Sequence, residues 1–181
     1  MTTSAAPAPV RITGEVVSKD PPPCLVGLPR RTGERPRIAR QYPCPQLTGA
    51  TDPRAQERLV ARARRWPGVD VATPRQTIPG GRALVLAEPL ALGQGEAFIL
   101  GREFAHVRAD GSVHCALAPE WAEPVLRDGW GEIHPLALYG LIQPQSLILY
   151  APRDAAEHEA VAALLLAAYA YACGHVVVGT P

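Results

Sequence analysis

Several features that would indicate common functions are missing from this sequence. Only Lys19 among its 18 basic residues is a lysine, and 17 acidic residues leave a formal net charge of +1. Such a chain lacks the basic footprint of proteins that bind nucleic acid or anionic membranes. Arginine replaces lysine, and alanine and proline are abundant, which suggests a G+C-rich genome. We therefore expect no nucleic-acid partner and no membrane partner.

Motifs for cofactors, redox chemistry and export are also absent. The four cysteines form no C-x-x-C pair, which argues against a zinc knuckle or a dithiol redox site. The sequence has no G-x-G-x-x-G, Walker loop or G-x-S-x-G elbow. Its N-terminus lacks the pattern of a signal peptide, and the longest apolar run, residues 160–173, is too short to span a bilayer. We expect a soluble cytoplasmic protein with free thiols.

The length of 181 residues suits one domain. Residues 1–23 are rich in proline and alanine and predict a flexible N-terminal arm, with one short strand at 10–17. The domain itself is expected at residues 24–174. Its first part, residues 24–50, is predicted to be an extended segment that packs over the surface of the domain. Residues 175–181 are expected to form a C-terminal tail.

Helix signals lie near both ends of this domain. Thr51-Asp52-Pro53 is a typical helix start, because a polar cap followed by proline satisfies free amides, and the helix is expected to end at Trp66. Asp154, with Glu157 three residues later, predicts the start of a long helix that ends before Gly174. This helix is apolar nearly all round. One side is expected to pack on a sheet, and the other to be covered by the arm or by a second subunit in a homodimer.

Between these helices the apolar pattern changes to that of strands. Sequential runs joined by short turns predict an antiparallel sheet of about five to six strands. The predicted strands are residues 69–72, 83–87, 97–100, 103–108, 112–117 and 146–150. A short helix kinked by Pro124 is expected at 119–128. The predicted fold class is α+β, with the sheet packed against the long C-terminal helix and the shorter N-terminal helix.

The stretch from residue 101 to residue 117 predicts a β-hairpin. A two-residue Asp-Gly turn would put His106 and His114 on opposite faces, whereas a three-residue loop with a left-handed glycine pairs them. Only the second register gathers an apolar face, and burial of such a face fixes register. That face consists of Ala105, Val107, Val113, Cys115 and Leu117. We therefore predict that His106 and His114 are cross-strand neighbours with Cβ atoms about 5 Å apart.

A third histidine, His134, follows, and the combined block resembles the luciferase domain family. In order, the block consists of Arg102-Glu103-Phe-Ala105-His106, Val113-His114-x-Ala116-Leu117, Gly129-Trp130-Gly131-x-x-His134-Pro135-Leu136-Ala137 and Tyr150-Ala151-Pro152-Arg153 before a helix. Upstream, Leu28-Pro29-Arg30-x-x-Gly33-x-Arg35-Pro36 is similar to that family's approach to the domain, so the resemblance covers roughly residues 24–173. The named members are the fungal luciferases.

The resemblance implies oxygenase chemistry. Fungal luciferases add O₂ to a hydroxylated pyrone, 3-hydroxyhispidin, and the endoperoxide that forms loses CO₂ and emits light. The implied function here is a cofactor-independent oxygenase of an enolisable pyrone or aromatic substrate, with O₂ as co-substrate. The fungal proteins begin with a membrane anchor and have a turn two residues longer between the first two histidines. This chain is therefore expected to be a bacterial-type member without an anchor, and the even difference in turn length keeps the two histidines on one face.

The resemblance implies that His106, His114 and His134 are catalytic residues, acting as general bases and anion-binding groups. Imidazole titrates near neutral pH, which suits this task. The same three imidazoles suit zinc, iron or copper, so a metal site is an alternative, although no metal is required. Glu103 falls opposite His106 in the predicted register and is not expected to be a fourth ligand. The candidate substrate-binding residues are Arg102, Glu103, Trp130, Tyr150 and Arg153.

Each of these binding residues also has a structural interpretation. Arg102 and Arg153 would neutralise an anionic substrate. Alternatively, Arg102 would form an ion pair with Glu103, and Arg153 with Asp154. Trp130 and Tyr150 would form an aromatic wall, or pack in the core. The alternative function from a different class is a non-catalytic small-molecule-binding or assembly module that uses the same cleft or the apolar C-terminal helix.

Overall fold

The computed structural model describes residues 11–12, 22–76, 78–174 and 177–178. Most of the predicted arm at 1–23 and of the predicted tail at 175–181 lies outside these residues. The described residues of each include one two-residue strand. Strand β1 (Arg11–Ile12) pairs antiparallel with β8 (Val177–Val178).

The predicted antiparallel sheet is confirmed, with six strands in the order β2-β3-β4-β5-β7-β6. Their bounds are β2 Val69–Ala72, β3 Arg82–Leu86, β4 Glu103–Val107, β5 Val113–Ala116, β6 Gly131–Ile133 and β7 Ser146–Leu149. The strand predicted at 97–100 is wrong, because a 3₁₀ turn occupies Gly95–Ala97 and Leu100 forms only an isolated bridge. Edge strand β6 was not predicted from the sequence.

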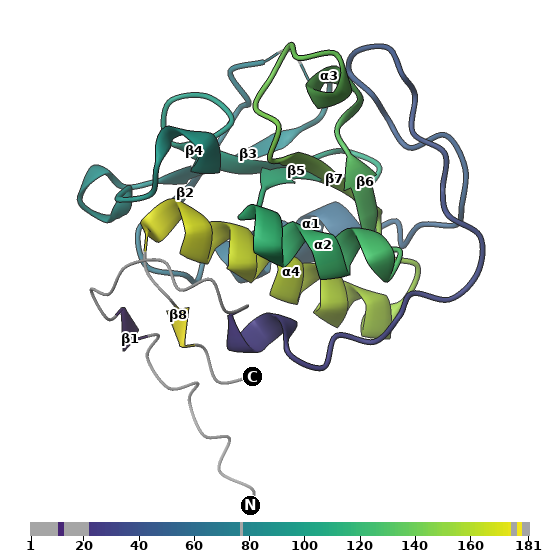
Figure 1. Cartoon of the computed structure of the whole chain (residues 1–181), viewed down its shortest axis with the longest axis horizontal. Coiled ribbons are helices and arrows are strands. Elements are labelled where there is room, and N and C mark those ends of the chain that lie inside the picture. The colour runs from purple at the N-terminus through teal and green to yellow at the C-terminus, as the bar shows by residue number, and fades with distance from the viewer. Residues whose placement is uncertain (1–10, 13–21, 77, 175–176, 179–181) are drawn as a thin grey trace, which may run out of the picture.

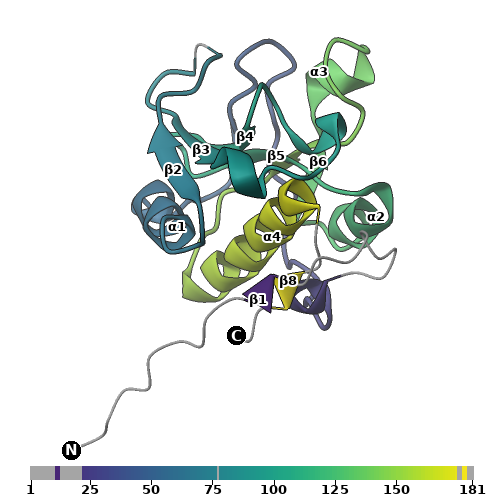
Figure 2. The same ribbon diagram turned by 90° about the vertical axis from the view of Figure 1, so that its left-hand side faces the viewer.

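Of the four α-helices in the described residues, three cover one face of the sheet (Figures 1 and 2). They are α1 (Ala55–Ala63), α2 (Pro119–Arg127) and α4 (Ala155–Cys173), while α3 (Pro135–Leu138) lies beyond the opposite face. Helix α1 is shorter than the predicted helix ending at Trp66. The helix also starts later than predicted: its N-cap is Arg54, without a side-chain cap hydrogen bond, and the Asp52 carboxylate accepts from the Arg54 amide just before the first helical residue, Ala55. The α+β fold is thus established.

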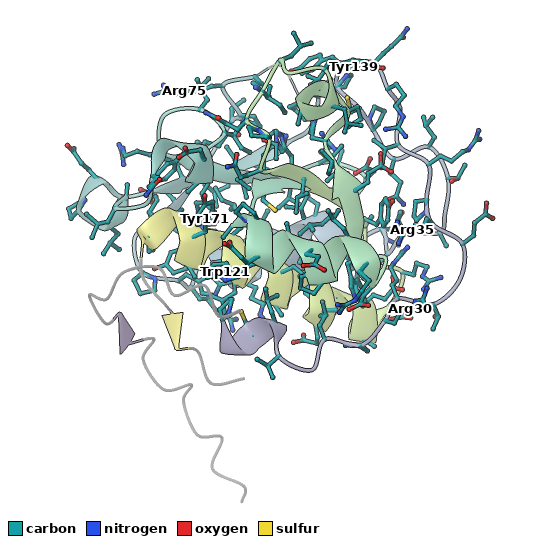
Figure 3. The ribbon with its side chains drawn as sticks, viewed as in Figure 1. Arg30, Arg35, Arg75, Trp121, Tyr139 and Tyr171 are labelled. Carbon is teal, nitrogen blue, oxygen red and sulfur yellow. The ribbon has the colours of Figure 1, made fainter. Side chains whose placement is uncertain are left out.

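Helix α4 is the centre of the core. As predicted, the Asp154 carboxylate caps it by accepting from the Glu157 amide at 2.9 Å, and Gly174 ends it in the left-handed conformation. The sheet covers one side of α4, and α1 and the 3₁₀ turn Pro23–Leu25 cover others. Figure 3 shows Trp121 of α2 beside Tyr171 of α4, with ring centroids 6.1 Å apart. Segments of the same chain therefore surround most of this apolar helix.

The later part of the extended segment predicted at 24–50, from Ile38 to Gln46, covers the opposite face of the sheet together with α3, whereas its start packs on α4. Ile38 and Cys44 of this segment pack on Ile148 and Tyr150 of the β7 region. An antiparallel bridge between Ile38 and Gln46 shapes the segment into a narrow loop. We call residues 38–46 the cover loop. Both faces of the sheet are therefore shielded from water, and polar side chains on the second face are buried.

The close packing of β6 on β7 gives a test of this edge of the sheet. A Cβ added at Gly131 would lie 2.5 Å from the carbonyl oxygen of Ile148, whereas one at Gly95 would meet nothing within 4 Å. We expect Gly131→Ala to lower the free energy of unfolding by about 1–3 kcal/mol, measured by urea denaturation. The control Gly95→Ala should change it by less than about 0.5 kcal/mol. Equal effects in the two variants would contradict the packing of β6.

Candidate functional site

The hairpin places the first two histidines side by side. His106 pairs with His114 across β4 and β5, and their rings lie 4.8 Å apart between centroids. The loop is the three-residue one, because Arg108 donates its amide to Ser112 at 2.8 Å and Gly111 has a φ of 85°. The predicted register is therefore confirmed, and both imidazoles lie on the face beneath the cover loop.

His134 joins this pair from the end of β6. Its ring centroid lies 4.4 Å from that of His114, and its backbone is held by an amide hydrogen bond to the Ser146 carbonyl. The three side chains are almost inaccessible, with residue exposures of 0% for His106, 2% for His114 and 3% for His134. The structure therefore brings the three predicted histidines into one buried cluster, which we call the imidazole cluster.

Glu103 also belongs to this site, contrary to the expectation that it would face away. Its Oε1 lies 2.8 Å from His106 Nδ1. The reason is a β-bulge: Ala105 pairs with Leu84, but Glu103 pairs with Val85, so β4 carries one extra residue. Phe104 and Ala105 consequently both enter the apolar core. The extra residue shifts Glu103 to the face that carries His106.

The hydrogen bonds assign the protons of two imidazoles. The Glu103 carboxylate can only accept, so Nδ1 of His106 carries a proton and Nε2, which has no partner among the described residues, has the lone pair. His134 is the N-cap of α3, and its Nδ1 accepts from the Leu136 amide at 3.1 Å. The proton of neutral His134 therefore sits on Nε2. His106 thus offers a base and His134 a donor.

Burial keeps the imidazole cluster neutral. It lowers the pKa of His134 to about 3, with further lowering from Arg108 and His106. Burial likewise holds the pKa of His114 well below its usual value, and the neighbouring histidines and Arg108 act in the same direction. The pKa of His106 is also lowered by burial, although the hydrogen bond to Glu103 opposes the shift. Near pH 7 these side chains are therefore uncharged.

Arg108 is a candidate site residue that we did not select from the sequence. It lies two residues after His106 on the same side of the hairpin, is 3% exposed, and brings Nη2 to 3.3 Å from His134 Nε2. Its Nε and Nη1 are buried without a hydrogen-bond partner among the described residues. The alternation of side chains along a strand was the signal that could have identified it.

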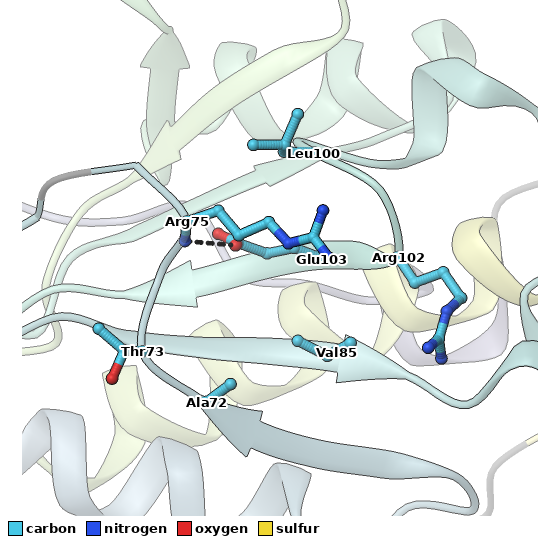
Figure 4. Close-up of a pocket in the computed structure, with 7 residues that line it drawn as sticks. All are labelled: Ala72, Thr73, Arg75, Val85, Leu100, Arg102 and Glu103. Atoms are coloured by element: carbon cyan, nitrogen blue, oxygen red, sulfur yellow. Dashed lines mark hydrogen bonds between the residues drawn. The ribbon is translucent and has the colours of Figure 1, made fainter.

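A cavity of about 200 Å³ adjoins the cluster on the side of Glu103 (Figure 4). Arg75 and Arg102 line it together with Glu103, whose Oε2 accepts from the Arg75 amide at 3.4 Å. Arg102 uses Nη1 to bind the carbonyl of Leu86 instead of forming the predicted alternative ion pair with Glu103. Arg102 therefore lines the same cavity as Glu103 without forming an ion pair with it.

The remaining predicted binding residues have structural partners. Arg153 binds the Glu157 carboxylate through Nε at 2.8 Å, so its ion pair is with Glu157 and not with the expected Asp154. Trp130 packs in the core and donates Nε1 to the Pro29 carbonyl. Tyr150 lies on the cover-loop side and donates its hydroxyl to Glu132 at 3.1 Å. These contacts favour the structural interpretation of the three residues.

No group of three or more His, Cys, Asp or Glu side chains in the ranges that the structure describes is arranged to hold a metal ion. No helix in those ranges is both long and apolar enough to cross a membrane.

The lowered histidine pKa values predict how stability changes with pH. Unfolded histidines bind protons below about pH 6.5, while the folded cluster does not, so stability should fall as the pH decreases from 7 towards 4. For each histidine, the free energy of unfolding should decrease by up to about 1.4 kcal/mol per unit of decreasing pH. His134→Asn removes one such group and keeps an oxygen to cap α3. We expect urea unfolding of this variant at pH 7.5 and pH 5.5 to show a smaller loss than the wild type; an equal loss would contradict a neutral buried His134.

Comparisons with known proteins bear on this same region. Residues 101–168 match the model of the luciferase domain, an interval that contains the hairpin, Arg108 and the three clustered histidines. A luciferase of Neonothopanus nambi is 39% identical over 74 residues, which represent 39% of this chain and 28% of the relative. The chain thus spans well under half the length of that curated relative. No solved structure matches it. The predicted resemblance is confirmed: residues 101–168, which carry the imidazole cluster, match the luciferase domain.

Proposed function

We propose that this protein is a luciferase-like small-molecule enzyme, a cofactor-independent oxygenase that adds O₂ to an enolisable pyrone or aromatic substrate. One observation carries the proposal. His106 is oriented by Glu103 through Nδ1, and its Nε2 lone pair is buried without a partner among the described residues. This is the arrangement of a general base whose proton position is fixed by a carboxylate.

The first step is removal of a proton from the enolic hydroxyl of the substrate. The lone pair on His106 Nε2 takes the proton, and the Glu103 carboxylate stabilises the imidazolium that results. Because burial lowers the pKa of His106, the base is neutral and available near pH 7. A positioned general base typically accelerates such a step by about 10²–10⁴-fold.

The second step joins the enolate to O₂. The electron pair of the enolate forms a C–O bond, so the substrate carbon is oxidised by two electrons and O₂ is reduced to the level of a peroxide. The proton held on His106 Nε2 then passes to the peroxide oxygen and restores the neutral base. Electron-rich enolates react with O₂ without a metal, so the substrate supplies all the electrons of the step.

His114 lies between the other two imidazoles. Its Nε2 is buried without a hydrogen-bond partner among the described residues, and its ring contacts both His106 and His134. It is therefore suited to bind a polar group of the substrate. The cover loop lies over this face, and entry of the substrate requires the loop to move. A closed, dry site strengthens each of these polar contacts.

The match to the luciferase domain supports this proposal, because the Neonothopanus nambi relative is a luciferase and the matched interval contains the imidazole cluster. The two alternatives, a binding or assembly module and a His-ligated metal enzyme, are outcomes of the tests below.

Oxygen uptake tests the role of His106. Purified protein is mixed anaerobically with 3-hydroxyhispidin and then exposed to O₂, and uptake is followed with an oxygen electrode. We expect His106→Gln to reduce kcat/KM by about 10²–10⁴-fold, because the substrate is no longer deprotonated. His158→Gln is the matched control: it changes another buried histidine, beside Glu159 on α4, and should leave the rate unchanged. Undiminished uptake by His106→Gln would refute the proposed base.

Glu103→Gln tests the positioning of that base through a pH profile. Loss of the carboxylate removes the contact that raises the pKa of His106, so the rising limb of kcat/KM should move to lower pH while the maximal rate falls. A merely structural glutamate would lower the rate without moving the limb.

Elemental analysis of the same samples addresses the metal alternative, since stoichiometric zinc, iron or copper would favour a ligand triad. The absence of any thermal shift with pyrones and catechols would favour the assembly module.

A further inference from the structure

Arg108 presents a positive charge that the described residues do not neutralise. Burial lowers the pKa of Arg108 and the charge of Asp110 opposes this shift, but the Asp110 carboxylate already accepts from the amides of Gln46 and Ser112 and from the Ser112 hydroxyl. Tyr42 and Cys44 of the cover loop also face Arg108. Burial raises the pKa of each, so both are uncharged near pH 7. The guanidinium itself keeps its proton, although burial lowers its pKa.

The contact between Arg108 and His134 points to a missing acceptor. The Leu136 amide occupies His134 Nδ1, so the Nε2 of neutral His134 carries a proton. Nη2 of Arg108, 3.3 Å away, can only donate. Two N–H groups therefore converge without an acceptor between them. An anionic oxygen placed between these groups would accept from both, and Nε or Nη1 of Arg108 would remain available for a second oxygen.

We propose that Arg108 and His134 form the receptor for a planar organic oxyanion, an enolate or carboxylate, within the imidazole cluster. Buried charges in proteins are normally paired, and removal of the partner of a buried charge is costly. Guanidinium binds planar oxyanions well because its donors form a rigid fork.

The two ends of the imidazole cluster then differ in the hydrogen-bonding groups that they offer to a ligand. His106 offers a lone pair at one end, and Arg108 with His134 offers donors at the other, with His114 between them. The identification of the oxyanion as the deprotonated substrate rests on the proposed function. The favoured substrate class is then a conjugated enol whose negative charge, after loss of the proton to His106, extends to an oxygen at Arg108.

Binding of benzoate, a planar carboxylate that cannot be oxygenated in this way, tests the receptor directly. We expect benzoate to raise the Tm of the wild type and its neutral analogue benzamide to leave the Tm unchanged. Arg108→Met should weaken benzoate binding at least tenfold, by isothermal titration. The control Arg82→Met makes the same change at an exposed arginine on β3, opposite Val107, and should bind benzoate like the wild type. Undiminished benzoate affinity in Arg108→Met would overturn the proposal.

A second readout separates a ligand receptor from a structural arginine. Without ligand, Arg108→Met should be at least as stable as the wild type, because it removes an uncompensated buried charge; a lower Tm would identify a structural role and overturn the proposal. If this variant fails to fold, NMR of the wild type decides. Benzoate should shift the Nε2–H signal of His134 but not the signals of His158, and an unmoved His134 signal would overturn the receptor.

These measurements involve no oxygen uptake, so the two proposals can fail separately. Unchanged oxygen uptake by His106→Gln would end the oxygenase proposal but leave an anion receptor intact. Absence of benzoate binding beside a strong effect of His106→Gln would end the receptor alone.

Discussion

The pairing of His106 with His114 across β4 and β5 is the contact on which the rest of the site depends. Burial of the opposite face against α4 fixes it, because a slip of one residue would turn the valines outwards and the imidazoles into the core. Packing of the hydrophobic core therefore determines which side chains lie on the second face of the sheet. The site is a consequence of the same register that makes the sheet stable.

The bulge at Phe104 adds a carboxylate to this arrangement. In a regular strand Glu103 and His106, three residues apart, would point to opposite faces. The extra residue lets Phe104 and Ala105 both enter the core, and Phe104 meets Tyr169 of α4 at 5.9 Å between ring centroids. Packing of an aromatic ring against α4 thus accompanies the orientation of a carboxylate on the opposite face. Bulges are often found beside active sites, where they redirect a side chain in this way.

Much of this could be predicted from the sequence, because local rules determine it. The hairpin loop, the register of His106 and the Asp154 cap follow from glycine, burial and capping preferences. Edge strand β6 could not be predicted, because three residues are too few to show the alternation of apolar and polar side chains that marks a strand. The bulge could not be predicted either, because it interrupts that alternation. Arg108 was missed because arginine is usually exposed, and only the fold reveals that a cover loop buries it.

Burial of polar side chains on the second face of the sheet costs free energy. Neutral histidines cost little, but the guanidinium of Arg108 has donors with no acceptor among the described residues, and the large core around α4 must offset that cost. An anionic ligand would supply the missing acceptor, so its binding would be coupled to the stability of the folded state. The same electrostatics favours the deprotonated substrate over the neutral one. In the proposed reaction, proton removal at His106 and charge binding at Arg108 would reinforce each other, since the enolate is stabilised only after its proton has left.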